Sequence, residues 1–198
     1  MIERIADWFA GKQIAAGIIR EEEKSIYTYG YILTMETVLN ICISLVIALL
    51  LQMIECFIVF SCMFIPLRIF CGGWHASKSW LCTLISNVTL TLVMVIVKYQ
   101  LVPFNMQIMG VVEAICLLIV FLLSPVEHEN KPLYNSERSA YGEISKILYI
   151  LQLVLLVLFY YANGMEIIES GMYAHVALVI SMLLALCQKH RNKDKNME

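Results

Sequence analysis

Charged side chains are scarce in this 198-residue sequence. Only 15% of the residues are Asp, Glu, Lys or Arg, whereas 60% are hydrophobic. A soluble domain of this size carries more charge, because its surface has to interact with water. The sequence also has no hydrophilic stretch long enough to form a separate soluble domain, no internal repeat and no low-complexity tract. The composition therefore excludes an ordinary soluble protein and predicts a polytopic membrane protein.

Cysteine pairs of the CxxC type are also missing, and the seven cysteines are an odd number. This pattern argues against a disulfide framework and against a zinc ribbon. Most of the cysteines lie inside apolar runs, where a thiol is a small packing residue: Cys42, Cys56, Cys62, Cys116 and Cys187. Only Cys71 and Cys82 lie beside polar residues, so these two are the candidates for chemistry.

Apolar runs bounded by charges or prolines recur along the chain. Crossing the hydrocarbon core of a bilayer takes about 20 apolar residues per helix. The runs that fit, with a short second run and a fourth that contains Glu113, are 37–54, 56–67, 79–97, 107–124, 147–165 and 172–188. Pro66, Pro103 and Pro125 predict helix ends. The expected fold is an all-α membrane protein with about six transmembrane helices.

The basic residues are distributed very unevenly around these runs. With six spans, 13 of the 14 Lys and Arg residues fall on one side, and Lys98 alone falls on the other. Short loops that are rich in Lys and Arg stay in the cytoplasm. We therefore expect both termini in the cytoplasm, a single transmembrane domain over residues 25–198, and cytoplasmic loops at 67–79 and 125–146.

The first 24 residues alternate between apolar and charged positions at helical spacing. A secretory signal needs a continuous apolar stretch, which the charges interrupt here. The pattern predicts an amphipathic helix on the inner leaflet, followed by a turn at 21–24. An interfacial anchor is the simpler interpretation, and docking of a substrate is the alternative.

The segment from Arg68 to Cys82, RIFCGGWHASKSWLC, joins the second and third predicted spans. His75 and Cys82 are seven residues apart, so both side chains share one face if the segment between them is helical. An imidazole beside a thiol can take its proton, and the resulting thiolate attacks carbonyl carbons. The start of a helix also favours a thiolate. Cys71 is the rival nucleophile, although Gly72 and Gly73 separate it from His75, and a purely structural role for the pair stays open.

Two intramembrane carboxylates deserve separate interpretations. Glu36 lies just inside the cytoplasmic end of the first span, where it could orient His75 as the third member of a triad. Its alternative is a carboxylate that pairs helices. Glu113 lies deeper, so we expect a neutral acid with a hydrogen-bond partner.

The loop PVEHENKPLY, residues 125–134, offers acidic, basic and imidazole side chains on the same side. Carboxylates and imidazoles bind divalent cations, so Glu127, His128 and Glu129 make a metal site conceivable. Their spacing matches no zinc motif such as HExxH. Contact with a substrate peptide is the favoured interpretation of this loop.

These residues together resemble the accessory gene regulator B (AgrB) family, the membrane cysteine endopeptidases that process quorum-sensing propeptides. The matching features cover nearly the whole chain: the N-terminal amphipathic helix, a turn at Tyr29-Gly30 with Glu36 and Asn40 in the first span, the Arg68…Gly73-x-His75…Cys82 core, and Glu129-Asn130-Lys131-Pro132-Leu133. The resemblance implies that His75 and Cys82 are the catalytic pair. It also implies an AgrD-like propeptide as substrate, cut through a thioester acyl-enzyme and cyclised to a thiolactone or lactone.

The resemblance further implies supporting roles for Arg68, Gly73 and Lys131, and no metal or organic cofactor. Some relatives have a proline shortly after the histidine, where this chain has Ser77 and Lys78. The expected location is the bacterial cell membrane, with the active site on the cytoplasmic side. The expected partners are the propeptide and the lipid bilayer. We also expect a homodimer, and we expect no binding of nucleic acid.

Two other functions remain as alternatives at this point. In a transporter or peptide-export partner without enzymatic activity, His75, Arg68 and Glu36 would line a polar pathway. No inverted repeat supports this alternative. In a metal-dependent intramembrane protease, His75, His128 and Glu36 would have to converge on one ion.

Overall fold

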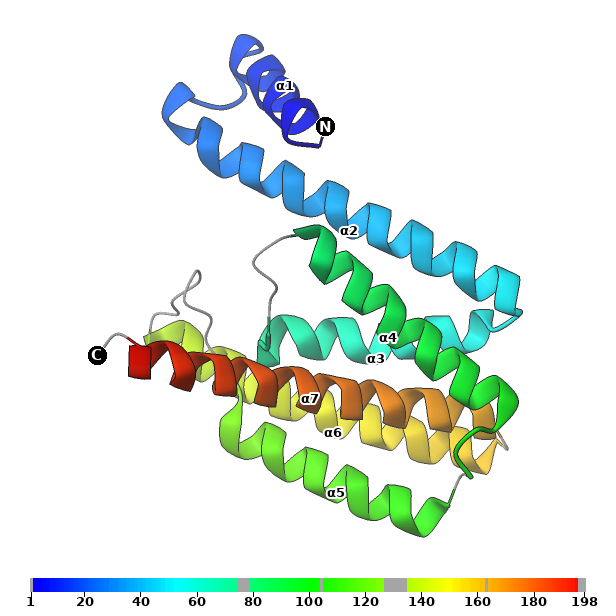
Figure 1. The fold of residues 1–198 in the computed structure, drawn as a ribbon. Helices are drawn as coiled ribbons and strands as arrows, with labels where there is room; N and C mark the ends of the chain where they lie inside the picture. The colour runs from blue at the N-terminus through cyan, green and yellow to red at the C-terminus, as the bar shows by residue number, and fades with distance from the viewer. Residues whose placement is uncertain (1, 75–78, 104, 127–134, 163, 196–198) are drawn as a thin grey trace.

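The chain is helical throughout the residues that the computed structural model describes: 2–74, 79–103, 105–126, 135–162 and 164–195. The elements are α1 (Ile2–Ala15), a short 3-10 helix η1 (Glu21–Glu23), α2 (Lys24–Leu51), α3 (Ile54–Cys71), α4 (Ser79–Tyr99), α5 (Met106–Leu123), α6 (Asn135–Tyr161) and α7 (Met165–Lys195) (Figure 1). Six of these, α2 to α7, are long and apolar enough to cross a membrane. The expectation of an all-α protein with six spans is confirmed.

Several helices extend beyond the apolar runs that predicted them. The helix end expected at Pro66 is wrong, because α3 continues through this proline to Cys71. Residues 135–146 of the predicted second loop belong to α6, and Tyr29-Gly30, expected in a turn, lies inside α2. Hydropathy locates the part of a helix that needs lipid, whereas the helix itself continues wherever packing and backbone hydrogen bonds sustain it.

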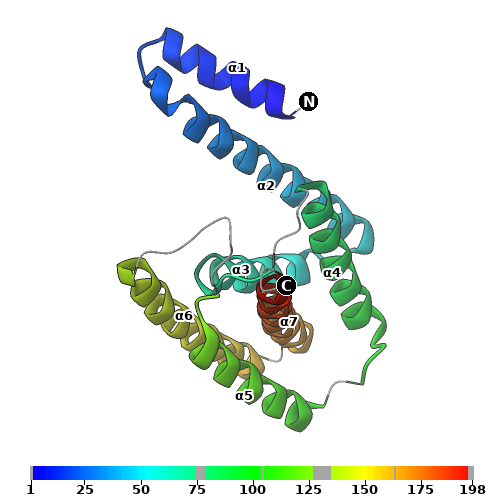
Figure 2. The same ribbon diagram turned by 60° about the vertical axis from the view of Figure 1, so that its left-hand side comes forward.

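Helix α7 occupies the centre of the bundle. In Figure 2 it is seen nearly end-on, with α3, α4, α5 and α6 around it. Of its spanning window, 44% is buried, the largest share among the six candidate spans in the described residues. Its buried positions include polar residues as well as apolar ones: Glu169, Ser170 and His175. The core of this protein is therefore organised around a helix that is not uniformly apolar.

Two apolar clusters fill the bundle around α7. One contains Phe60, Met94 and Met172, towards the end where α7 begins. The other contains Leu67, Tyr149 and Leu178, towards the end where α3, α5 and α7 finish and where α4 and α6 begin. We call this second end the C-terminal end of the bundle. The end of α3 with Arg68 and the turn 72–74 lie at this end, so the second cluster supports the described part of the candidate site.

Helices α1 and α2 lie at the periphery of the bundle (Figure 1). Only 11% of the spanning window of α2 is buried, and α4 is its main contact within the bundle. Helix α1 packs on α2 through the fully buried Ala6 and Ala10 and leaves Trp8 exposed. An ion pair of 2.9 Å joins Lys24 Nζ to Asp7 Oδ1. The N-terminal helix is thus attached to α2 rather than to the central bundle.

Candidate functional site

The turn that follows α3 is fixed by hydrogen bonds from two helices. The guanidinium of Arg68, near the end of α3, donates through Nη2 to the carbonyl oxygen of Trp74. The backbone N–H of Trp74 donates to the carbonyl oxygen of Ser181 in α7, at 2.9 Å. Gly73 lies between these anchors with φ +136, and a Cβ there would overlap Arg68 Nη1 and approach Ser181 Oγ to 2.8 Å. Only glycine fits this position without displacing the arginine.

The same turn is joined to the segment that follows α5. Val126 donates its backbone N–H to the carbonyl oxygen of Cys71 at 2.8 Å, and Gly72 forms a parallel bridge with Val126. Gly72 has φ +74, and a Cβ there would overlap the carbonyl oxygen of Val126. The bases of the two predicted loops, 67–79 and 125–146, are therefore held side by side. Sequence analysis did not anticipate this contact.

Cys82 is the fourth residue of α4 and is half-buried. All seven cysteines of the chain are free thiols. Arg68 lies within electrostatic range of both Cys82 and Cys71. Its Nη1 atom is shielded from solvent and makes no hydrogen bond among the described residues. A positive charge therefore lies near the candidate nucleophile.

Cys71, the rival nucleophile, is fully buried. It belongs to the apolar cluster at the C-terminal end of the bundle, together with Leu67 and Val126. A thiol with no exposed surface cannot reach a peptide bond in this conformation. Of the two cysteines that lie beside polar residues, Cys82 is the accessible one.

Glu36 lies on α2 and is half-buried, with no hydrogen bond to the described part of the chain. It is one helical turn before Asn40 and two turns before Ser44, so the three share a face of α2. Asn40 and Ser44 both hydrogen-bond the buried Asn87 of α4, the latter through Ser44 Oγ to Asn87 Oδ1 at 2.8 Å. The face that carries Glu36 is therefore the one that packs on α4, the helix of Cys82.

The remaining predicted site residues lie outside the described residues. They are His75 and Lys131, together with Glu127, His128 and Glu129 of the second loop. The distance between His75 and Cys82 thus stays a prediction. The described contacts join Arg68 and Gly73 to Trp74 and to Ser181 of α7.

Comparison with known proteins assigns the chain to a family. The family described as accessory gene regulator B matches residues 2–186. The chain belongs to the accessory gene regulator B family. Two AgrB-like proteins of Clostridium perfringens, from strain SM101 and strain 13, are 25% and 26% identical over 181 residues, covering 87% of this chain and 85% of each relative. No solved structure matches the chain. Membership in the AgrB family implies a part in the processing of quorum-sensing propeptides at a membrane.

A buried cluster of polar side chains in this AgrB-family chain was predicted only in part from the sequence. Glu113 was expected to be a hydrogen-bonded acid, and it accepts a hydrogen bond from Tyr149 Oη at 2.7 Å. Sequence analysis missed its second partner, His175, whose Nδ1 lies 3.0 Å from Glu113 Oε2. The available signal was that both are ionisable residues inside apolar runs, where such groups tend to pair.

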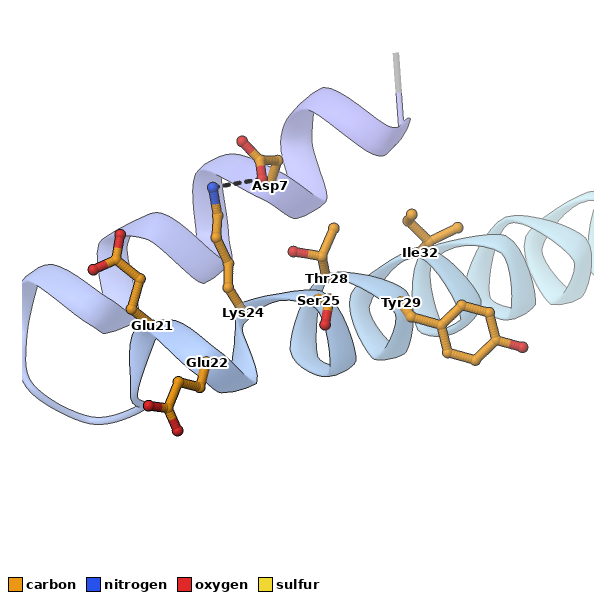
Figure 3. Close-up of a pocket in the computed structure, with 8 residues that line it drawn as sticks. All are labelled: Asp7, Glu21, Glu22, Lys24, Ser25, Thr28, Tyr29 and Ile32. Carbon is orange, nitrogen blue, oxygen red and sulfur yellow. Dashed lines mark ion pairs between the residues drawn. The ribbon is translucent and has the colours of Figure 1, made fainter.

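Two hollows lie near the ends of the helices in this AgrB-family chain. One, of about 510 Å³, lies between α1 and the start of α2 (Figure 3). Its lining residues are Asp7, Glu21, Glu22, Lys24, Ser25, Thr28, Tyr29 and Ile32. The other, of about 320 Å³, is lined by Pro125, Gly142 and neighbouring residues beside the second loop. Neither Cys82 nor Arg68 lines either of these two hollows.

The described residues of this AgrB-family chain contain no group of three or more His, Cys, Asp or Glu side chains that could hold a metal ion. The metal ligands considered in the sequence, His75 and His128, are outside that part of the chain. The described part of the candidate site consists of a thiol, a guanidinium and backbone groups.

Proposed function

We propose that this protein is a membrane cysteine endopeptidase that cleaves an AgrD-like propeptide and promotes its cyclisation. Cys82 is the nucleophile, and His75 is the general base and acid. The single observation that carries the proposal is the position of Cys82, which is accessible, in the first turn of a helix and within electrostatic range of Arg68. A helix N-terminus and a nearby cation both stabilise a thiolate.

The proposed reaction is an acyl transfer in two steps. His75 takes the proton of Cys82, and Sγ attacks the carbonyl carbon of the scissile peptide bond. The C–N bond breaks, His75 returns the proton to the leaving amine, and the N-terminal part of the peptide stays on Sγ as a thioester. A thiol or hydroxyl within that peptide then attacks the thioester, which releases Cys82 and closes the thiolactone or lactone. Because the second nucleophile is tethered, it outcompetes water.

Arg68 and Gly73 support this chemistry through the turn 72–74. With Nη2 used on Trp74, Nη1 is the donor that remains for the thiolate or for the oxyanion of the tetrahedral intermediate. A donor of this kind is worth about 2.7–4 kcal/mol of transition-state stabilisation. Lys131 of the second loop is a contact for the propeptide, and Glu36 is the residue that would orient His75.

The proposed active site faces the cytoplasm. The positive-inside rule supports this orientation, since 13 of the 14 basic residues fall on the side of the site. A cytoplasmic site keeps Cys82 reduced and accessible to a newly made propeptide. The N-terminal amphipathic helix would then lie on the inner leaflet beside the substrate.

The test is the processing of a synthetic AgrD-type propeptide by the full chain in lipid vesicles. Cys82→Ala is expected to abolish cleavage, whereas Cys62→Ala is expected to retain it, because Cys62 is an exposed thiol on the outside of α3. Mass spectrometry of the wild-type protein should detect the peptide acyl group on Cys82. Cleavage by the Cys82→Ala protein would refute the proposed role of Cys82. No cleavage by the wild-type protein would leave the transporter alternative in its place.

A second measurement tests the role of Gly73. Gly73→Ala places a Cβ against Arg68 Nη1 and Ser181 Oγ. We expect it to lower the cleavage rate by about a hundredfold, since displacements of about 1 Å at an active site have effects of that size. Gly110→Ala is the control, because nothing lies within 4 Å of a Cβ at that position. Equal rates for the two variants would show that the turn 72–74 takes no part in the reaction.

A further inference from the structure

Four polar side chains meet in the interior of the bundle, away from Cys82. They are Glu113 of α5, Tyr149 and Gln152 of α6, and His175 of α7, and all four are buried. Along α7, His175 separates the apolar cluster that contains Met172 from the one that contains Leu178. Ionisable groups at such a position are costly unless they are paired. The mechanism proposed above makes no use of them.

The hydrogen bonds in this cluster fix the position of one shared proton. Gln152 donates through Nε2 to the carbonyl oxygen of Met63 at 3.1 Å, so its Oε1 is the atom 2.9 Å from His175 Nε2. Nε2 must therefore carry a hydrogen and donate. On the other side of the ring, Nδ1 lies 3.0 and 3.1 Å from the two carboxyl oxygens of Glu113. One proton is held between Nδ1 and the carboxyl group, whichever of the two it is bound to, and the pair has no net charge.

Gln152 makes this cluster a link between α3 and α7. Its amide bridges the carbonyl oxygen of Met63 in α3 and the imidazole of His175 in α7. The ring of Tyr149 stacks on that imidazole, with centroids 4.4 Å apart, while its hydroxyl holds Glu113 of α5. If α3 slid along α7 by one residue, about 1.5 Å, Gln152 could not keep its hydrogen bonds to both Met63 and His175 at their present lengths.

The same two helices hold the turn before Cys82 from both sides. Arg68 is between one and two helical turns beyond Met63 on α3, and Ser181 is at a similar distance beyond His175 on α7. Arg68 and Ser181 both bind the backbone of Trp74. The relative position of α3 and α7 therefore determines whether both anchors of the turn form.

We propose that Glu113, Tyr149, Gln152 and His175 are positioning residues that set the register of α3 against α7 and so hold Arg68 and the turn 72–74 next to Cys82. The cluster acts through its hydrogen bonds, not through gain or loss of a proton. This inference deepens the proposed function and rests on it wherever cleavage is the readout. The alkylation of Cys82, which reports on the turn directly, does not depend on it.

The first test removes the link between α3 and α7 in the full chain. Gln152→Leu keeps the volume but loses both hydrogen bonds, and Gln152→Asn is a milder variant, too short to reach both partners. Ser170→Ala is the matched control, because it removes another buried bond between the same helices, Ser170 Oγ to the Cys56 carbonyl oxygen at 2.9 Å, far from the turn. Alkylation of Cys82 by iodoacetamide is followed by mass spectrometry, at a temperature at which circular dichroism shows every variant folded.

Both Gln152 variants should alkylate about threefold to tenfold more slowly at Cys82, because the guanidinium of Arg68 is no longer held within electrostatic range of the thiol. Cleavage of the synthetic AgrD-type propeptide should fall by about tenfold to a hundredfold. Ser170→Ala should match the wild-type protein in both measurements. Wild-type alkylation in a folded Gln152→Asn protein would overturn the inference. If Cys82→Ala still cleaves the propeptide, the proposed function fails, but the alkylation result retains its meaning.

The second test separates position from proton exchange. In Glu113→Gln, the amide can accept from Tyr149 and donate to Nδ1 of a neutral His175, so every hydrogen bond of the cluster is retained. Glu113→Leu loses them. We expect Glu113→Gln to keep cleavage and Cys82 alkylation within about twofold of wild type, and Glu113→Leu to behave like Gln152→Leu. Loss of activity in a folded Glu113→Gln protein would contradict positioning and would indicate that the cluster must exchange its proton.

Discussion

Helices α7 and α2 are both apolar enough to cross a membrane, but they occupy opposite environments. The less apolar of the two, α7, is the more buried, with 44% of its window inside the protein against 11% for α2. In a water-soluble protein, the more apolar of two helices would be the more buried one. In lipid, apolar side chains gain nothing by leaving the surface, whereas polar ones need partners that only the protein interior provides. The distribution of polar groups, and not hydropathy, therefore indicates which span is central.

The largest difference in stability between variants of α7 and α2 is expected when one polar group is removed from each helix. His175→Leu in α7 leaves Glu113 without its main partner, so we expect a loss of about 3–5 kcal/mol in unfolding free energy. Thr37→Leu in α2 should change stability by less than about 0.5 kcal/mol, because the exposed Thr37 hydroxyl bonds only to Leu33 of its own helix. Thermal unfolding in detergent micelles, followed by circular dichroism, measures both. Similar losses of unfolding free energy in the two variants would show that this part of α2 also packs against the rest of the protein.

Glycines provide the next largest contrast. A Cβ on Gly171 of α7 would lie 2.5 Å from Leu156 Cδ2 and 3.0 Å from Met63 Sδ, whereas nothing lies within 4 Å of one on Gly30 of α2. Gly171→Leu should therefore cost about 1–3 kcal/mol through overpacking. Gly30→Leu should be neutral or slightly stabilising, because leucine favours a helix more than glycine does. The same unfolding assay compares the two variants. If Gly30→Leu destabilised the protein, Gly30 would have to contact another part of the protein.

A single polar contact between α2 and the bundle offers a smaller effect. Ser44 and Asn87 form a buried hydrogen bond between α2 and α4. Ser44→Ala should cost about 1 kcal/mol, as single interhelical hydrogen bonds in membranes do. A double-mutant cycle with Asn87→Ala should give a coupling energy of similar size. A coupling near zero would mean that the hydrogen bond between Ser44 and Asn87 does not help to hold α2 to α4.

The smallest expected effect belongs to the attachment of α1. Lys24 and Asp7 form an ion pair whose side chains are 39% and 59% exposed. Lys24→Met should change the unfolding free energy by less than about 0.5 kcal/mol, because exposed ion pairs are screened by water and salt. Lys12→Met, outside this pair, is the control. A clear difference between the two variants that disappears at high salt would show that the pair anchors α1 more strongly than we expect.

The candidate site was predictable in part. The segment from Arg68 to Cys82 stands out in the sequence because glycines, charge, a histidine and a thiol interrupt apolar runs. The glycines at 72 and 73 do adopt positive φ, as their permissive backbone allows. The choice of Cys82 over Cys71 needed the fold, because both thiols have polar neighbours along the chain and only packing buries one of them.

The amino-acid sequence by itself determined that six segments are long and apolar enough to cross a membrane, because the hydrocarbon core imposes a local requirement on length and apolarity that each segment meets alone. It also marked the reactive segment. Only the tertiary structure decided that α7 is central, that Glu113 pairs with His175, and that Gly72 adjoins Val126. These contacts join residues more than 50 positions apart, and helical periodicity tells which face a residue occupies but not which helix that face will meet.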